Sequence, residues 1–191
     1  MEWVFWVTTM CSLVVLVVFF LLYSFSDIKC VWPPCISELM EVHKSVILLF
    51  FGFACAMVWL NLTLISLIQH DETMLIIGTA IYFSFLGIMS FDITAHRYVH
   101  YAFVLSYIAT SLAYVNLASN GARDDAATAV NALTCLFAAS AVFKWLAPGW
   151  EHTLKYPYTF IEIGWVIALF CYTLDHSYRS RNDFNTLLTG R

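Results

Sequence analysis

The charged residues of this chain are confined to short segments, and between them lie uncharged, apolar runs. An α-helix rises about 1.5 Å per residue, so about twenty apolar residues cross the hydrocarbon core of a bilayer. Only 12% of the 191 residues are charged, whereas 61% are hydrophobic. This pattern predicts an integral membrane protein and excludes an ordinary soluble domain or a disordered chain.

Six apolar runs predict an all-α, polytopic membrane protein, a single transmembrane domain in which six helices form an antiparallel bundle. The predicted helices cover residues 3–23, 45–68, 74–91, 98–117, 126–146 and 159–174, and a polar C-terminal tail covers 175–191. The loop 69–73 is so short that the second and third helices must form a hairpin. Asp124 and Asp125 suit the start of the fifth helix, where the helix dipole favours negative charge.

The charges also bear on orientation and on partners. Six helices place both termini on one side of the membrane, although Lys and Arg are almost equally divided between the two sides. The arginines of the tail, Arg179, Arg181 and Arg191, favour cytoplasmic termini. The formal net charge of −4, without any basic patch, excludes nucleic acid as a partner.

Two cysteines, Cys30 and Cys35, lie together in the polar first loop, separated by Val-Trp-Pro-Pro. They are a candidate disulfide pair if this loop faces an oxidising lumen or the cell exterior, and free thiols otherwise. A zinc knuckle is disfavoured because no second pair of Cys or His at ligand spacing follows nearby.

Polar residues gather on one predicted side of the bundle. The loops after the first, third and fifth helices share a side, and they carry Glu38 and the segment from Asp92 to His100. Glu162, one turn into the last helix, and Trp165 lie next to the same side. We expect this face to contact lipids or a partner protein.

Two interpretations of this face remain open. In one, Asp92, His96 and His100, spaced i, i+4 and i+8 on one helical face, bind a divalent metal such as zinc. The further ligand is Glu162, or else His43 or His152 from another loop. Such a metal would activate water against a lipid ester or amide. In the other, Asp92, His96 and Arg97 lie at the membrane rim. His100 is then a buried histidine bonded to a neighbouring helix, with Glu162 as its candidate partner. A lipid-headgroup or ion site is the third option.

Three segments resemble the Frag/DRAM/Sfk family of six-helix membrane proteins. Cys35-Ile-Ser-Glu38, after Trp-Pro-Pro, is similar to the Tyr-Ile-Ser-Asp segment of that family's first loop. The stretch from Phe91 to His100-Tyr101 is similar to its Phe, short polar stretch and His. The last helix, with Glu162 and Trp165 and an exit at Asp183-Phe184, resembles its Glu-Trp helix and Asp-Phe exit. The family's Pro-Pro-Glu-Ser run is absent from this chain. In the family the Glu and the Trp are adjacent, whereas Glu162 and Trp165 are separated by two residues.

The resemblance implies a protein without catalytic activity that regulates membrane lipid organisation, trafficking or autophagy. It implies that the protein resides in the plasma membrane or in an endolysosomal membrane. Its expected partners are membrane lipids and other membrane proteins, and no cofactor is expected. Relatives of one fold differ in function, so a metal-dependent lipid hydrolase and a small channel or transporter subunit stay as alternatives.

Overall fold

The computed structural model describes residues 44–69, 71–93, 95–119, 124–146 and 151–189, with single positions in 1–21. Every regular element in these ranges is an α-helix, which confirms the predicted all-α class for this part of the chain. In chain order the helices are α3 (Lys44–Gln69), α4 (Glu72–Ser90), α5 (Arg97–Ala118), α6 (Asp125–Leu146) and α7 (Glu151–Thr189). The first predicted helix, 3–23, lies almost wholly outside the described residues, so the count of six stays a prediction.

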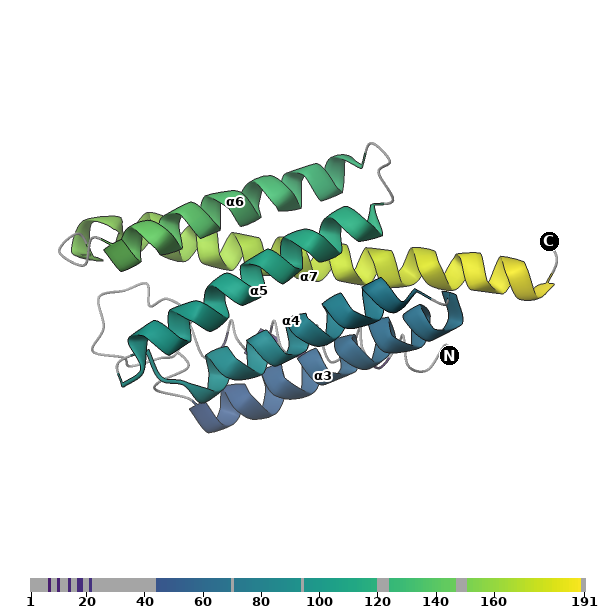
Figure 1. Ribbon diagram of the computed structural model, residues 1–191, viewed down its shortest axis with the longest axis horizontal. Helices are drawn as coiled ribbons and strands as arrows, with labels where there is room; N and C mark the ends of the chain where they lie inside the picture. Colours follow the sequence, from purple (N-terminus) through teal and green to yellow (C-terminus); the bar gives the residue numbers. More distant parts are fainter. Residues whose placement is uncertain are drawn as a thin grey trace.

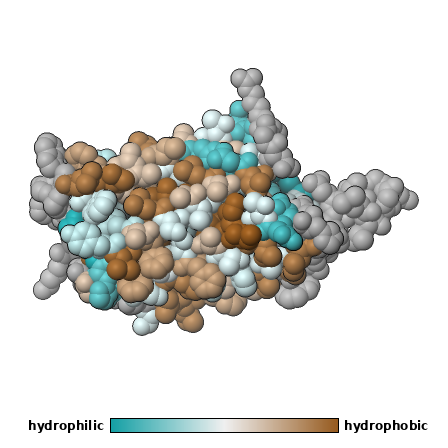
Figure 2. Space-filling view, viewed as in Figure 1, coloured by the Kyte–Doolittle hydropathy of each residue, from teal (hydrophilic) through white to brown (hydrophobic). Residues whose placement is uncertain are grey.

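Four helices are long and apolar enough to cross a membrane. Their spans are Glu72–Ser90, Arg97–Ala118, Asp125–Phe143 and Pro157–Ser180. Large apolar side chains on the outer faces, such as Ile76, are exposed rather than packed. On the face drawn in Figure 2, apolar residues cover most of the middle and hydrophilic residues lie mainly toward the two ends. An apolar exterior of this kind requires lipid around it, so the chain is an integral membrane protein.

Helices α3 and α4 form the predicted hairpin. Asp71 lies at the end of the turn between the two helices and caps α4, because its side chain accepts a hydrogen bond from the amide of Met74 at 2.9 Å. The indole N–H of Trp59 then donates to the hydroxyl of Thr79 at 3.2 Å. These residues stand at similar distances before and after the turn, so α4 runs back along α3.

Helix α5 lies between the α3–α4 pair and the α6–α7 pair (Figure 1). The hydroxyls of Ser84 and Ser106 join α4 to α5 at 2.8 Å. Three residues further along α4, Gly87 lies against the ring of Phe103 on α5, where a Cβ atom would come within 2.2 Å of the ring. Glycine therefore permits the close approach of these two helices.

The core forms where α5, α6 and α7 meet. Its most deeply buried large side chains are Tyr114 and Val115 of α5, Phe137 of α6, and Trp165 and Tyr172 of α7. Phe137 and Trp165 stack with ring centroids 4.5 Å apart, and Tyr114 meets Tyr172 edge to face at 6.4 Å. Aromatic pairs in these geometries add to the packing between helices.

The last helix is much longer than the predicted 159–174, since α7 runs from Glu151 to Thr189. Pro157 lies inside it, where the sequence predicted a loop. A proline removes one backbone hydrogen bond, which a transmembrane helix tolerates when its neighbours support it. The predicted polar tail 175–191 is helical up to Thr189, and Figure 1 shows that this end of α7 extends beyond the other helices.

Candidate functional site

The residues predicted to form one helical face are only partly helical. Asp92 and His96 lie in the link between α4 and α5, because α5 begins at Arg97. His96 is the exposed residue that precedes the helix, and its side chain makes no capping hydrogen bond. The prediction that Asp92, His96 and His100 share one face of a helix is therefore wrong.

His100 is a buried structural histidine. Its side chain is 3% exposed, and Nδ1 lies 2.7 Å from the carbonyl oxygen of Phe91, which ends α4. A carbonyl oxygen only accepts, so Nδ1 carries the hydrogen of this bond. This bond ties the start of α5 to Phe91, the residue that follows α4, and the pairing of His100 with Glu162 stays a prediction.

The four predicted ligands whose side chains the structure describes, Asp92, His96, His100 and Glu162, do not form a metal centre. Among the side chains described by the structure, no three of His, Cys, Asp and Glu gather closely enough to hold a metal ion. Asp92, His96 and His100 all belong to the described part of the chain. Glu38, His43, Cys30 and Cys35 lie outside it, so the predictions made for them are untested.

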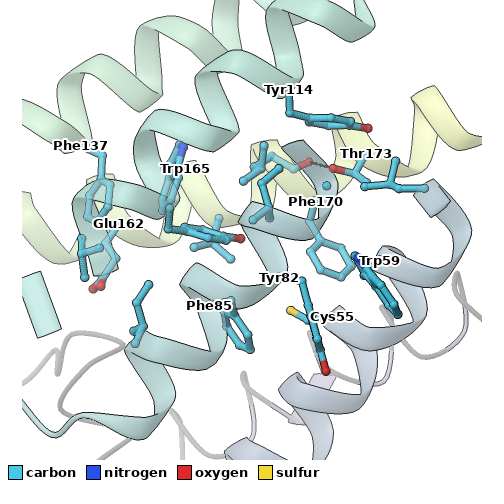
Figure 3. Close-up of a pocket in the computed structure, with 18 residues that line it drawn as sticks. Cys55, Trp59, Tyr82, Phe85, Tyr114, Phe137, Glu162, Trp165, Phe170 and Thr173 are labelled. Carbon is cyan, nitrogen blue, oxygen red and sulfur yellow. Dashed lines mark hydrogen bonds between the residues drawn. The ribbon is translucent and has the colours of Figure 1, made fainter. Parts of the chain in front are cut away.

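Glu162 and Trp165 lie instead at a cavity of about 120 Å³ inside the bundle (Figure 3). All five described helices contribute to its wall, among others through Trp59 of α3, Tyr82 of α4, Tyr107 of α5, Phe137 of α6 and Phe170 of α7. Glu162 is 5% exposed and is the one acidic side chain among the described residues of the wall. An ionisable group at this depth in a membrane is a functional candidate by default.

Trp165 holds one side of the cavity rigid. Its indole N–H donates to the hydroxyl of Thr134 on α6 at 2.9 Å, and Thr134 donates onward to the carbonyl of Val130 at 2.6 Å. Tyr107 meets the indole ring edge to face, with centroids 5.5 Å apart. The indole is thus fixed from two neighbouring helices, and Phe137 stacks on its face with centroids 4.5 Å apart.

The opposite side of the cavity is formed by α3 and α4. Trp59 and Tyr82 stack with centroids 5.4 Å apart, and Cys55 lies beside them in Figure 3. Gly78 leaves room here: an added Cβ would meet Leu62 of the facing helix at 3.6 Å, an ordinary contact. Trp59, Tyr82 and Cys55 are partly exposed, unlike the buried Trp165 side.

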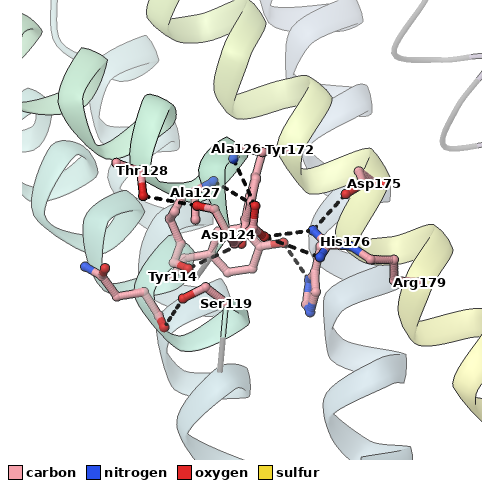
Figure 4. A network of polar contacts seen from close by, with 12 residues as sticks. Tyr114, Ser119, Asp124, Ala126, Ala127, Thr128, Tyr172, Asp175, His176 and Arg179 are labelled. Atoms are coloured by element: carbon pink, nitrogen blue, oxygen red, sulfur yellow. Dashed lines mark hydrogen bonds and ion pairs between the residues drawn. The ribbon is translucent and has the colours of Figure 1, made fainter. Parts of the chain in front are cut away.

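A second polar cluster, which was not predicted from the sequence, joins α5, α6 and α7 (Figure 4). The hydroxyl of Tyr114 lies 2.8 Å from Nδ1 of His176. The guanidinium of Arg179 pairs with Asp175 at 2.7 Å and with Asp124 at 3.3 Å. Arg179 and Asp124 are fifty-five positions apart in the chain, so only the fold brings them together.

Asp124 caps α6, as the sequence predicted. Its carboxylate accepts hydrogen bonds from the amides of Ala126 at 3.0 Å and Ala127 at 3.2 Å. The amide of Ala127, followed by the Arg179 guanidinium and the amide of Ala126, lowers the pKa of this carboxyl below its usual value. The carboxylate is therefore held ionised at the end of the span, where it ties α6 to α7.

Comparison of the chain with known protein families, with curated proteins and with solved structures finds no match. The chemistry of the site therefore rests on its own residues. The cavity offers a largely aromatic and aliphatic surface with one carboxyl group, which suits an apolar ligand with at most one polar group. The cluster of Asp124 and Arg179 offers charges that are already paired with each other.

Proposed function

We propose that this protein is a non-enzymatic multi-pass membrane protein that regulates the organisation or trafficking of membrane lipids. The cavity carries the proposal. Well-packed helices leave few voids larger than a water molecule, whereas this bundle leaves about 120 Å³ lined by aromatic side chains. A concave, mostly apolar pocket between helices is typical of a ligand site, and in a membrane the abundant apolar ligands are lipids.

The polar groups of the described residues support a regulator more than a hydrolase. His100 joins the start of α5 to the end of α4, and Asp124 with Arg179 joins α6 to α7. These contacts hold helix ends together, as expected for ionisable side chains at the edges of membrane spans. Structural contacts of this kind favour a protein that acts by binding lipid over one that hydrolyses it.

The likeness to the Frag/DRAM/Sfk family supports the same proposal through the segments around Glu38, His100 and Glu162. With it we propose six antiparallel helices, cytoplasmic termini and residence in the plasma membrane or an endolysosomal membrane. Membrane lipids and other membrane proteins are then the partners, and autophagy is one of the processes to be examined. Because one fold serves several functions, activity has to be measured directly.

The test is expression of the tagged full chain in cultured cells. Fluorescent lipid biosensors and lipid analysis of purified organelles then measure how lipids are distributed between membranes. We expect the wild-type protein to change that distribution and Glu162→Gln, which keeps the shape of the side chain, to change it less at equal abundance. Release of fatty acid from a lipid ester by the purified protein, or an unchanged lipid distribution, would contradict the proposal.

A further inference from the structure

We infer that the cavity binds a single acyl chain of a membrane lipid, which enters from the bilayer between α3, α4 and α7. The ligand class rests on the function proposed above and adds to it the identity of the bound group. Its support is the depth of the cavity, the chemistry of its wall, its size and the side on which its wall is exposed.

The cavity lies at the depth of lipid chains. Along α7 its wall extends from Glu162 to Thr173, and both residues lie inside the span Pro157–Ser180. At about 1.5 Å per residue, these two positions are about 16 Å apart along the helix axis. The wall is therefore long in the direction of the helices, which suits a chain-shaped ligand lying between them.

The wall offers few free polar groups. The N–H groups of Trp59 and Trp165 donate to threonine hydroxyls, and the hydroxyl of Thr173 donates to a backbone carbonyl of its own helix. The hydroxyl of Tyr114 is bonded to a histidine ring at 2.8 Å. Besides these groups, the wall carries the carboxyl group of Glu162 and the hydroxyls of Tyr82 and Tyr107, and the rest of it is carbon atoms and aromatic faces. A bulky headgroup would lose hydration over most of this surface without gaining partners there.

The volume sets the width of the ligand. An engineered apolar cavity of about 150 Å³ stays dry and binds benzene. The present cavity, about 120 Å³, is similar and therefore admits a short length of one narrow hydrocarbon chain. The fused rings of a sterol, or two chains side by side, are much larger than benzene and do not fit.

The exposure of the wall shows where the chain enters. Trp59, Tyr82 and Phe170 are partly exposed, whereas Phe137 and Trp165 on the other side are buried. Figure 3 shows the first three residues together, opposite Phe137 and Trp165. The cavity thus has a closed aromatic end toward α6 and a more open end toward the bilayer.

The bilayer itself supplies the occupant. Phe83, next to Tyr82 on α4, and Ile76 are large apolar residues exposed on the outside at this depth. The molecules that meet these side chains in a membrane are acyl chains. An acyl chain therefore reaches the open side of the cavity without leaving the hydrocarbon layer.

Photolabelling of the full-length protein tests this site. The protein is reconstituted in bilayer discs of phosphatidylcholine with a diazirine on one acyl chain, irradiated and mapped by mass spectrometry. We expect adducts at Trp59, Tyr82 or Phe170, and loss of these adducts in Gly78→Leu, whose side chain fills the cavity. Gly78→Ala, whose Cβ fits at 3.6 Å from Leu62, should keep them.

Two further measurements make the outcome decisive. Phe83 on the outer face should be labelled equally in every variant, which controls for reconstitution. Val166→Phe fills the cavity from α7 and replaces Gly78→Leu if that variant does not fold. Wild-type protein labelled only on its outer face, or cavity adducts that persist in a folded, filled variant, would overturn the site.

The outcomes also separate this site from the proposed function. Cavity adducts in a protein that leaves the cellular lipid distribution unchanged would keep the acyl-chain site and refute the regulatory function. A change in lipid distribution without cavity adducts would refute the site alone.

Discussion

The close approach of α4 and α5 at Gly87 gives the sharpest test of the packing. A Cβ atom added at Gly87 would lie 2.2–2.4 Å from three ring atoms of Phe103. The ring cannot simply turn away, because it stacks on Phe91 with centroids 5.6 Å apart and planes at 11°. Gly87→Ala must therefore push the helices apart or break that stack, an overpacking that typically costs about 1–3 kcal/mol.

Gly164→Ala is the matched control for this variant. Gly164 is also inside a long helix, but its added Cβ meets nothing within 4 Å. Both substitutions gain similar helix propensity, up to about 1 kcal/mol, so the difference between them isolates the steric clash. For a chain of this size, 1–3 kcal/mol corresponds to a difference of about 2–12 °C in thermal midpoint.

The assay is thermal unfolding of the purified variants in one detergent, followed by size-exclusion chromatography after heating. We expect Gly87→Ala to melt below Gly164→Ala by the stated interval. Phe103→Leu should remove most of the penalty of Gly87→Ala, as a double-mutant cycle would show. Equal midpoints for Gly87→Ala and Gly164→Ala would refute the close contact between α4 and α5.

Three further predictions use the same unfolding assay. Trp165→Phe loses the indole hydrogen bond to α6 and should destabilise the protein by about 1 kcal/mol or somewhat more; an unchanged midpoint would mean that this bond does not form. Ser84→Ala removes the hydrogen bond to the hydroxyl of Ser106 and should lower the free energy of unfolding by about 0.6 kcal/mol. Replacing both serines by alanine should lower it by no more than the sum of the two single substitutions. Asp124 has a pKa lowered mainly by the amide of Ala127, so its stabilisation is complete above the unfolded pKa of about 4 and is lost as the pH falls through the lower folded pKa. The wild-type protein should therefore have a higher free energy of unfolding than Asp124→Asn at pH 7. This difference should shrink as the pH falls below about 4, and a difference that does not change with pH would contradict the charge effect.

The sequence by itself determined that the protein lies in a membrane and where most of its described helices begin and end. Apolar runs of membrane length allow only segments that satisfy their own backbone hydrogen bonds, so the positions of α3 to α6 follow closely from the pattern of charges. The cap at Asp124 followed for the same local reason, because a helix start needs an acceptor for its free amides. The end of α7 did not follow, because Pro157 and a polar tail are usual signs of a helix boundary.

Only the tertiary structure decided what the polar residues do. Spacing along the chain suggested that Asp92, His96 and His100 share a helical face, but α5 begins only at Arg97, so Asp92 and His96 lie in the link before it. Trp165 is bonded to Thr134 on α6, thirty-one positions away, and Asp124 is paired with Arg179 on α7, fifty-five positions away. A cavity is a property of how five helices pack, and no local pattern records the space that they leave.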